Sequence, residues 1–350
     1  MMNQKDDRIL YLSGKDVQQA CQEIDSVAII REVFAMHGSG QTILPDEAYL
    51  GWTNVKGESV RSLSMPAYVG GTLDMAGTKI INGNIANPAR GLPRASGLTL
   101  LFDPTTIRIV CIMEGAYISS LRTASVTALS VDLFNGNNIQ TMAIIGAGVL
   151  ARAHIELLVK RLPHMRQIQL FDLDEQRIAT LQQQVAPILE AKGIVTQATR
   201  TAEEAIRSAQ LIVPVTTTTQ GYIHFDWLQA GTLLVNISLD DPLPEVVLRA
   251  DKVIVDDWNL VKNDPRRLIG RMYREGKVIG PDDSMEVAGS DSRRIDAQLG
   301  EIVTGAKAGR TNANEIIVVN PFGLAIEDVA LAGHVYRKAR DAGMGVWLER

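Results

Sequence analysis

A glycine-rich turn in the middle of the chain constrains the fold more than any other feature. The segment 143–154, AIIGAGVLARAH, places Gly146, Gly148 and Ala151 in the pattern G-x-G-x-x-A, after an apolar strand-like run and at the start of a helix-like run. Glycines at these positions allow a tight turn and let backbone N–H groups approach a pyrophosphate at the positive end of the helix. The turn predicts a dinucleotide-binding βαβ unit; the alternative is a strand-to-helix turn that binds nothing.

Strand-like and helix-like segments alternate after this turn. The runs RQIQLFDLD, AQLIVPVTTT, GTLLVNISLDD and ADKVIVDDW indicate further buried strands. This alternation predicts a parallel sheet that helices cover on both faces. Before the turn, residues 60–113 carry apolar, β-branched runs broken by Gly, Pro and Asn, which predicts strands joined by short loops.

The remaining segments predict helices at both chain ends. Residues 8–12 indicate a short strand, and Ser13 is expected to cap one helix through DVQQACQEIDSVAIIREVFAMH. The run GAYISSLRTASVTALSVDLF predicts a long, mostly buried helix, and another amphipathic helix follows Pro321. Residues 278–300 are polar and rich in turn-forming residues, which predicts a surface loop.

Composition narrows the class of protein. A chain of 350 residues with 46% hydrophobic and 21% charged residues is typical of a soluble globular protein of two domains. The net charge of −5 argues against nucleic-acid binding, and no apolar run is long enough for a membrane helix. The N-terminus has no signal-peptide pattern, and Cys21 and Cys111 form no disulfide framework, which predicts a cytoplasmic location. The scattered histidines predict no metal site.

Asp172 strengthens the prediction of a dinucleotide site. It ends the strand QLFD, which is the next strand after the glycine-rich turn. A carboxylate there accepts hydrogen bonds from the adenosine ribose hydroxyls and repels a 2′-phosphate, so it favours NAD over NADP. Arg177 lies nearby in the sequence and keeps NADP as the less favoured alternative.

Asp241 is the candidate acid–base group. It follows the apolar run LLVNIS, and ligands of open α/β sheets meet the carboxyl ends of the strands. A carboxylate at this point could exchange a proton with a substrate nitrogen. The alternative is a turn or helix cap, for which Asp-Pro sequences are common.

Three cations lie in or beside segments that are expected to be internal. Lys79 is in the strand MAGTKIING, Arg122 interrupts the helix YISSLRTASV, and Arg61 precedes SLSMPAY. Burying an unpaired cation is costly, so each is expected to meet an anion or to reach solvent. Together they predict a clamp for a substrate carboxylate. A structural salt bridge would explain each of them singly.

Motifs along nearly the whole chain resemble the ornithine cyclodeaminase and mu-crystallin family. In order they are AGTKIING with GLPRASG, YISSLRTA, IIGAG, GYIHFDWLQAG, NISLDD, VIVDDW, LGEIVTG and NPFGLAIEDVA. PRASG, DWLQ, LGEIVTG and the short interval from Asp241 to Glu245 are most similar to the family's branch of N-(2-amino-2-carboxyethyl)-L-glutamate dehydrogenases, which serve 2,3-diaminopropionate and siderophore biosynthesis. Cyclodeaminases typically carry a longer D-x-P-G-K-x-E segment at that interval.

The resemblance implies an α/β fold with an inserted domain. A Rossmann NAD-binding domain, residues 132–320, would interrupt an α+β substrate-binding and dimerisation domain built from residues 1–131 and 321–350. The protein would be a homodimer acting on a small amino acid substrate. Lys79 and Asp241 would form the catalytic pair, with Lys79 and Arg122 on the substrate carboxylate and Asp241 beside the nicotinamide.

The resemblance also implies a set of ligand contacts. Arg94 would contact NAD or a second substrate carboxylate, and Arg61 would join it in binding substrate. Glu47, in LPDEAYL, stands where relatives usually carry a basic residue, so the substrate is expected to have lost an anionic group or gained a cationic one. The residues expected along the cofactor are Arg94, Arg122, Thr123, Gly146, Gly148, Val149, Leu150, Asp172, Arg177, Thr216, Thr217, Asn236 and Ser238.

Four activities follow from these expectations. The leading hypothesis is NAD-dependent oxidation of an N-(carboxyalkyl) amino acid to 2-oxoglutarate and L-2,3-diaminopropionate. The alternatives are an ornithine cyclodeaminase, which forms proline and ammonia, and a related imine reductase, which would run the same site in reverse. A non-catalytic crystallin-like binding protein is least favoured, because Lys79 and Asp241 are both present.

Overall fold

The computed structural model describes residues 7–134, 138–284 and 292–350, and the chain forms two compact units. Met1–Arg122 and Leu324–Arg350 form the first, which we call the terminal unit; Thr123–Gly323 form the second, which we call the Rossmann unit. The family resemblance implied domain boundaries after residues 131 and 320. The compact units of the structure divide after Arg122 and Gly323.

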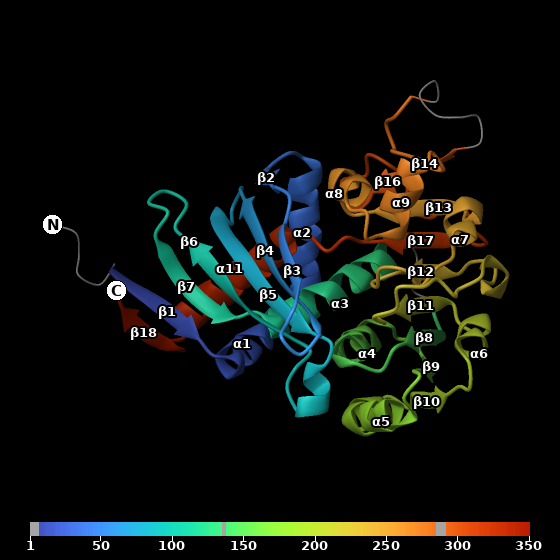
Figure 1. Ribbon diagram of the computed structural model, residues 1–350, viewed down its shortest axis with the longest axis horizontal. Helices are drawn as coiled ribbons and strands as arrows, with labels where there is room; N and C mark the ends of the chain where they lie inside the picture. The colour runs from blue at the N-terminus through green and yellow to red at the C-terminus, as the bar shows by residue number, and fades with distance from the viewer. Residues whose placement is uncertain (1–6, 135–137, 285–291) are drawn as a thin grey trace. The chain divides into compact units, whose positions relative to one another are not determined.

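The terminal unit is built on one mixed sheet (Figure 1). The sheet order is β18-β1-β7-β6-β5-β4-β2, with β3 also paired to β4; only the β1–β7 pairing is parallel among those that the structure describes. The elements are β1 (Arg8–Leu12), α1 (Gly14–Cys21), α2 (Ser26–Gly38), β2 (Thr42–Ile43), β3 (Ala48–Thr53), β4 (Ser59–Val69), β5 (Met75–Asn84), the 3-10 helix η2 (Asn87–Arg90), β6 (Ala95–Phe102), β7 (Ile109–Glu114), α11 (Ala325–Asp341) and β18 (Val346–Glu349).

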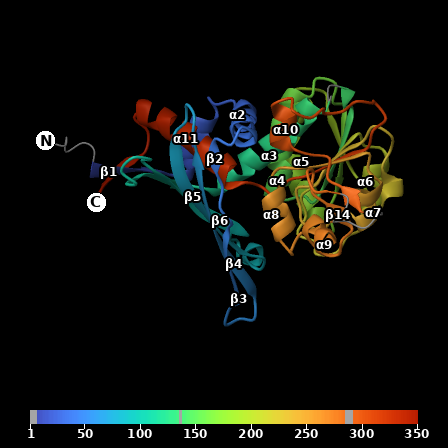
Figure 2. The ribbon, with the colours of Figure 1, turned by 90° about the horizontal axis from the view of Figure 1, so that it is seen from above.

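Alternating side chains decide which face of this sheet is covered. In β4, Leu63, Met65, Ala67 and Val69 are buried, and the residues between them are half-buried. Because successive side chains of a strand point to opposite faces, the buried set lies on the face that α11 packs against. Along β3, by contrast, every residue is exposed, and Figure 2 shows the β3–β4 hairpin extending away from α11.

The predicted single helix after Ser13 is wrong, because the segment forms two helices. Ser13 caps α1 in a capping box with Asp16, as the sequence indicated. Asp25 then caps a second helix, α2, by accepting hydrogen bonds from the backbone N–H groups of Val27 and Ala28, each at 3.1 Å. A side chain that satisfies backbone donors at a helix start favours a new helix over a continuous one.

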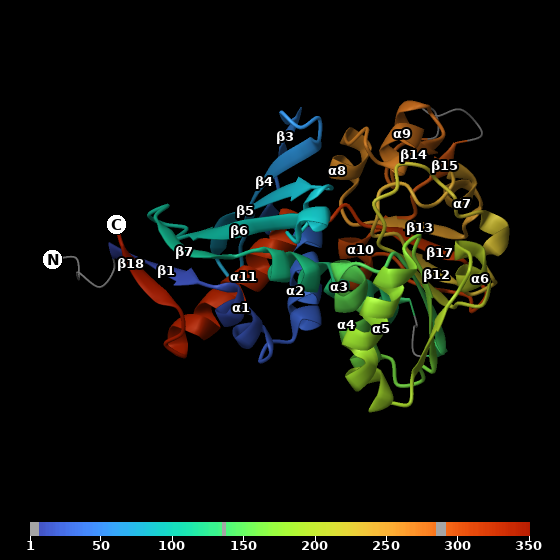
Figure 3. The same cartoon turned by 60° about the horizontal axis from the view of Figure 1, so that its bottom comes forward.

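The Rossmann unit contains an eight-stranded sheet in the order β10-β9-β8-β11-β12-β17-β13-β16, and all its described pairings are parallel. Helix α3 (Ala116–Leu133) leads into it. Figure 3 shows α4 and α5 on one face of the sheet and α6 and α7 on the other. The remaining elements are β8 (Thr141–Ile145), α4 (Val149–Arg161), β9 (Gln167–Phe171), α5 (Glu175–Glu190), β10 (Val195–Ala198), α6 (Ala202–Arg207), β11 (Leu211–Pro214), the 3-10 helix η4 (Phe225–Trp227), β12 (Leu233–Val235), α7 (Pro244–Arg249), β13 (Lys252–Val255), α8 (Trp258–Asn263), α9 (Leu268–Arg274), β14 (Val278–Ile279), β15 (Arg293–Arg294), β16 (Ala297–Gln298), α10 (Leu299–Val303) and β17 (Ile317–Asn320).

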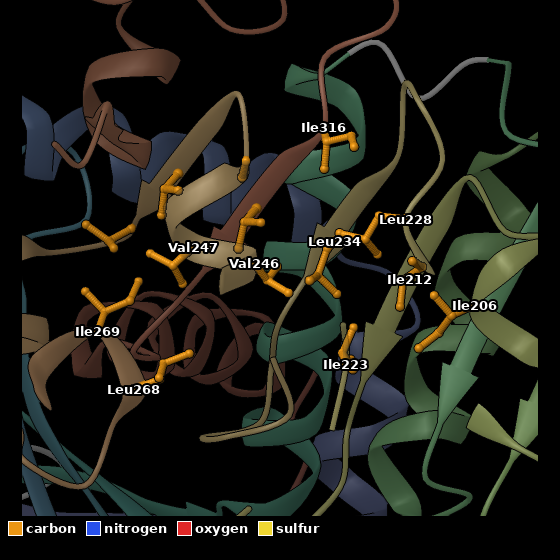
Figure 4. Close-up of a cluster of buried hydrophobic side chains, with 14 of the residues drawn as sticks. Ile206, Ile212, Ile223, Leu228, Leu234, Val246, Val247, Leu268, Ile269 and Ile316 are labelled. Atoms are coloured by element: carbon orange, nitrogen blue, oxygen red, sulfur yellow. The ribbon is translucent and has the colours of Figure 1, made fainter. Parts of the chain in front are cut away.

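A buried apolar cluster packs α6 and α7 against one face of the Rossmann sheet (Figure 4). Ile212 and Leu234 from neighbouring strands meet Ile206 of α6, and Val246 and Val247 of α7. All of these side chains are fully buried. Removing apolar surface from water supplies about 25 cal/mol per Å², so this packing stabilises the attachment of α6 and α7 to the sheet.

The surface-loop prediction for residues 278–300 is wrong for much of the part that the structure describes, although Asp282 and Ser284 are exposed and lie outside any helix or strand. Val278, Ile279, Ile295 and Ala297 are buried. The strands β14 and β15 pair with each other, and β16 extends the main sheet by pairing with β13. Residues 285–291 of the predicted loop lie outside the described residues. In the described ranges, no helix has the length and apolar character needed to span a membrane.

Candidate functional site

The glycine-rich turn between β8 and α4 has the geometry of an anion cradle. Gly146 has a φ of 99°, and a Cβ on it would lie 3.0 Å from the carbonyl oxygen of Val215. Gly148 begins α4 without a side-chain cap, and a Cβ there would meet nothing within 4 Å. The first N–H groups of a thirteen-residue helix are therefore free of a capping side chain and open on the side where a phosphate would bind.

Asp172 lies directly beside this turn. Its Oδ2 accepts a hydrogen bond from the Ala147 N–H at 2.7 Å, and its Oδ1 accepts one from the Asp174 N–H at 2.9 Å. The carboxylate thus joins the glycine-rich turn to the end of β9 and keeps lone pairs for a further donor. Arg177 does not bond to it: the Arg177 guanidinium lies 3.4 Å from Asp174 at the surface.

Of the other residues expected along the cofactor, Thr216, Thr217, Asn236 and Ser238 follow the carboxyl ends of β11 and β12. The Thr216 N–H donates to Ser238 Oγ at 3.0 Å, and Asn236 Nδ2 donates to the Ser238 carbonyl at 3.1 Å. Asn236 is fully buried, and its Oδ1 has no hydrogen-bond partner in the described part of the chain. Thr217 and Val149 are exposed, whereas Leu150 and Thr123 are half-buried.

Asp241 is the centre of a buried polar cluster in the Rossmann unit. Its Oδ1 accepts hydrogen bonds from Thr216 Oγ1 and from the Tyr222 hydroxyl, both at 2.8 Å. The residue is 0% exposed. Burial raises the pKa of Asp241, while the hydroxyls of Thr216, Tyr222 and Ser238 act in the opposite direction. The raised pKa allows this carboxyl to hold a proton closer to neutral pH than an ordinary aspartate.

The neighbouring acid has different partners. Asp240 Oδ1 lies 2.5 Å from Arg271 Nη2, so its charge is paired within the Rossmann unit. Asp241 instead meets only hydroxyl and backbone donors among the groups that shift its pKa. The two adjacent acids are thus separated by their hydrogen-bond partners, a guanidinium for Asp240 and hydroxyls for Asp241. Tyr222 was not predicted from the sequence, because the loop contact that brings it to Asp241 leaves no local pattern.

A second charged cluster lies in the terminal unit. Lys79 Nζ donates to Asp328 Oδ2 at 2.7 Å, and Arg122 Nη1 donates to Glu327 Oε2 at 2.9 Å. Arg122 Nε also lies 3.4 Å from Asp328 Oδ1. All four side chains are buried. Burial lowers the pKa of Lys79, the charge of Asp328 raises it, and the charge of Arg122 lowers it.

Glu327 and Asp328 are buried partners of Lys79 and Arg122 that the sequence reasoning missed. They are adjacent acids in the first turn of α11, within the otherwise apolar run AIEDVALAG, and that interruption was the available signal. They form salt bridges with Lys79 and Arg122, which was the alternative explanation for these two cations. A substrate carboxylate would have to share these cations with the two acids, so the carboxylate clamp stays a prediction.

Arg61 and Arg94 lie close enough to influence each other. Burial and the charge of Arg61 lower the pKa of Arg94. Arg61 lines a hollow of about 510 Å³ on the terminal unit, together with side chains that include Trp52 and Asn82. Glu47 is half-buried in the loop before β3. Among the described residues, no group of three His, Cys, Asp or Glu side chains could hold a metal ion.

The sequence matches a model of one family over almost its full length. The family is described as the ornithine cyclodeaminase/mu-crystallin family, and the match covers residues 11–343. The chain belongs to the ornithine cyclodeaminase/mu-crystallin family. The motif resemblance from the sequence is confirmed.

Individual members of the ornithine cyclodeaminase/mu-crystallin family extend this result. An N-((2S)-2-amino-2-carboxyethyl)-L-glutamate dehydrogenase of Staphylococcus aureus is 32% identical over 97% of this chain and 98% of its own length. The crystal structure of CmnK has a TM-score of 0.88 with 34% identity and covers 98% of both chains. An archaeal alanine dehydrogenase, solved as a dimer with bound NAD, has a TM-score of 0.80 with 24% identity, over 97% of this chain and 99% of its own. The protein is an enzyme of this family, and the predicted α/β fold with a Rossmann domain is confirmed.

Proposed function

We propose that this enzyme is an NAD-dependent dehydrogenase that oxidises the secondary amine of an N-(carboxyalkyl) amino acid. N-(2-amino-2-carboxyethyl)-L-glutamate is the proposed substrate, with 2-oxoglutarate and L-2,3-diaminopropionate as products. The observation that carries the proposal is the buried carboxyl of Asp241 with a raised pKa, in a chain 32% identical to the staphylococcal dehydrogenase of that name.

The glycine-rich turn and Asp172 would hold the cofactor. The positive φ of Gly146 and the uncapped start of α4 fit a pyrophosphate. Asp172 would accept hydrogen bonds from the ribose hydroxyls and would repel a 2′-phosphate. Bound NAD would supply the hydride acceptor. We therefore propose NAD over NADP, to be tested by comparing kcat/KM for the two cofactors.

Asp241 would handle the proton that the reaction must move. The substrate amine has to lose a proton before hydride leaves the glutamate α-carbon, and Asp241 would accept it. Loss of hydride from that carbon to bound NAD would give a protonated imine. Water then adds to the imine carbon and releases one proton to solvent, and breaking the C–N bond returns the amine and a ketone. Asp241 would return the proton to the leaving nitrogen.

Lys79 and Arg122 would bind the substrate carboxylate through charge-assisted hydrogen bonds. Glu327 and Asp328 would keep both cations in place, because each cation is already hydrogen-bonded to one of these acids. The half-buried Glu47 would disfavour a further carboxylate and favour the free amine that this substrate carries.

We also propose that the enzyme is a cytoplasmic homodimer. The archaeal alanine dehydrogenase was solved as a dimer. In the terminal unit, Leu50 and Trp52 of β3 are 61% and 49% exposed, which is typical of a surface that a partner covers. Both Cys21 and Cys111 are buried free thiols, as expected of a protein in a reducing compartment.

The proposal is tested with the purified protein, NAD and a panel of N-(carboxyalkyl) amino acids and ornithine. We expect NADH absorbance to rise with an N-(carboxyalkyl) amino acid, with stoichiometric formation of a 2-oxo acid. Ammonia release from ornithine without net NADH would establish a cyclodeaminase instead. If no panel member yields NADH or ammonia, the proposed activity is contradicted.

A further inference from the structure

Two hydroxyl groups converge on one oxygen of the candidate acid, and this asymmetry has a chemical consequence. Asp241 Oδ1 accepts hydrogen bonds from Thr216 Oγ1 and the Tyr222 hydroxyl at 2.8 Å each. Asp241 Oδ2 is sealed from solvent and has no hydrogen-bond partner among the residues that the structure describes. The two oxygens of this carboxyl are therefore chemically distinct.

Both hydroxyls are committed as donors to Oδ1. Thr216 Oγ1 already accepts the Thr218 N–H at 3.1 Å, so its single hydrogen is free to point at Asp241. A tyrosine hydroxyl also carries one hydrogen, and a carboxylate oxygen can only accept it. Both acceptor sites of Oδ1 are occupied by these donors, so protonating Oδ1 would displace one of them, whereas protonating Oδ2 disturbs neither.

The loop that carries Tyr222 is fixed to the Asp241 loop by the backbone. The N–H groups of Tyr222 and Ile223 both donate to the Asp241 carbonyl at 2.9 Å, and Ile223 pairs with Pro242 in a parallel bridge. Ile223 is fully buried in the apolar cluster of Figure 4. A Cβ on Gly221 would lie 3.0 Å from the Pro242 carbonyl oxygen, so the close approach of the two loops favours glycine there.

We propose that Tyr222 is a positioning residue for proton transfer: with Thr216 it holds Asp241 through Oδ1 and leaves Oδ2 as the oxygen that exchanges the proton with the substrate nitrogen. This inference rests on the proposed function, because it takes Asp241 as the acid–base group. In amine oxidation the proton passes from the substrate nitrogen to Oδ2, and Oδ1 keeps both hydroxyl contacts throughout.

The groups that face Asp241 make the effect of Tyr222 measurable. They are the hydroxyls of Thr216, Tyr222 and Ser238, and no cation is among the causes that shift its pKa. Burial and the charge of Asp241 raise the pKa of Tyr222, so its hydroxyl stays protonated. Removing one neutral donor from the carboxylate should therefore raise the pKa of Asp241, with no other charge to compensate.

The experiment compares Tyr222→Phe with wild type in the pH profile of kcat/KM for amine oxidation. Activity in this direction needs ionised Asp241, so the acid limb should move to higher pH, by about one pH unit for one hydrogen bond to a charged group. Tyr273→Phe changes a tyrosine of the same unit that packs on Trp258, and it should leave the limb in place. Thr216→Val should shift the limb as Tyr222→Phe does, and Thr216→Ser should restore it.

A second readout separates this inference from the proposed function. The carboxyl NMR signal of Asp241 in isotope-labelled protein without NAD, assigned by its loss in Asp241→Asn, should titrate at higher pH in Tyr222→Phe. If that signal titrates at the same pH in Tyr222→Phe and wild type, and the acid limb of kcat/KM does not move, the positioning role is overturned even if Asp241→Asn is inactive. If no amine substrate yields NADH, the proposed function fails, and the NMR titration still decides whether Tyr222 controls Asp241. If Tyr222→Phe does not fold, Thr216→Val carries the same expectation.

Discussion

The Lys79 cluster of the terminal unit and the Asp241 cluster of the Rossmann unit bury ionisable side chains in opposite ways. In the terminal unit, Lys79 and Arg122 meet Glu327 and Asp328, so two buried cations face two buried anions. In the Rossmann unit, Asp241 is buried among hydroxyl and backbone donors that carry no charge. An opposite charge favours the charged form of each partner, although burial still lowers the pKa of Lys79, whereas neutral donors leave a buried acid near the point where it can gain or lose a proton.

His154 belongs to the same pattern as Asp241. It is fully buried in the Rossmann unit, and burial lowers its pKa to about 4. Its Nδ1 lies 2.7 Å from the Leu150 carbonyl and its Nε2 lies 2.9 Å from Thr127 Oγ1. A carbonyl can only accept, so Nδ1 carries the hydrogen and Nε2 accepts from the threonine. The contrast between the two clusters therefore separates groups that hold charge from groups that exchange or exclude protons.

The largest expected effect comes from removing the exchangeable proton. Asp241→Asn keeps the shape of the side chain, but it cannot accept a proton from the substrate amine. We expect kcat to fall about 10²–10⁴-fold, the usual contribution of a general acid–base group, with NAD affinity preserved. Steady-state kinetics and NAD titration measure the two quantities. Full activity would mean that the Asp241 loop is only a turn.

The next effect tests the paired cluster. Lys79→Met leaves Asp328 buried without its hydrogen-bonded cation, so we expect the free energy of unfolding to fall by about 3–5 kcal/mol. The double variant Lys79→Met/Asp328→Leu removes both charges and should recover much of that loss in urea unfolding. A single variant as stable as wild type would show that Lys79 and Asp328 do not depend on each other, and the comparison between the units would fail.

The residues of these two clusters could be predicted from the sequence to different extents, for a physical reason. The glycine-rich turn directly follows β8 and Asp241 follows β12 after a short loop, and position along a βαβ unit is local information. The partners of Lys79 and Arg122 come from α11, more than half the chain away in sequence, and a cation in a strand does not reveal which helix will cover it. Tyr222 reaches Asp241 through a contact between two loops, which no periodicity encodes.

Secondary structure was likewise predicted correctly where the sequence signal is local and incorrectly where it is not. Alternation of strands and helices predicted the parallel sheet, which the eight-stranded Rossmann sheet confirms. Ser13 was predicted as a cap, but Asp25 was not, because a single acid inside a helix-like run can either cap a new helix or lie on a solvated face. In residues 278–300, the buried Val278 and Ile295 were hidden by the polar residues between them.

A smaller effect sharpens the pH side of the comparison. The folded pKa of His154, about 4, lies below its ordinary value of 6.5, so its contribution to stability is present above about pH 6.5 and is lost as the pH falls toward 4. The shift corresponds to about 3 kcal/mol. Urea unfolding from neutral to mildly acidic pH should show this loss in wild type and a weaker one in His154→Gln. His164→Gln, at an exposed histidine of the same unit, is the matched control, and equal slopes in all three proteins would contradict the role of His154.

The smallest expected effect belongs to the neighbour of the candidate acid. Asp240 is charge-paired with Arg271, whose side chain is 40% exposed, so Asp240→Asn leaves a guanidinium that solvent can hydrate. We expect the free energy of unfolding to fall by about 1 kcal/mol, as for a partly exposed ion pair, and kcat to change by less than about tenfold. Arg271→Gln removes the same pair from the other side and should match it in both measurements. The two acids are adjacent in sequence and both are buried, so burial alone cannot distinguish them; only their partners can. A loss of kcat in Asp240→Asn equal to that in Asp241→Asn would assign the proton transfer to the charge-paired acid, and the distinction between paired and exchangeable groups would then be wrong at the one position where it matters most for catalysis.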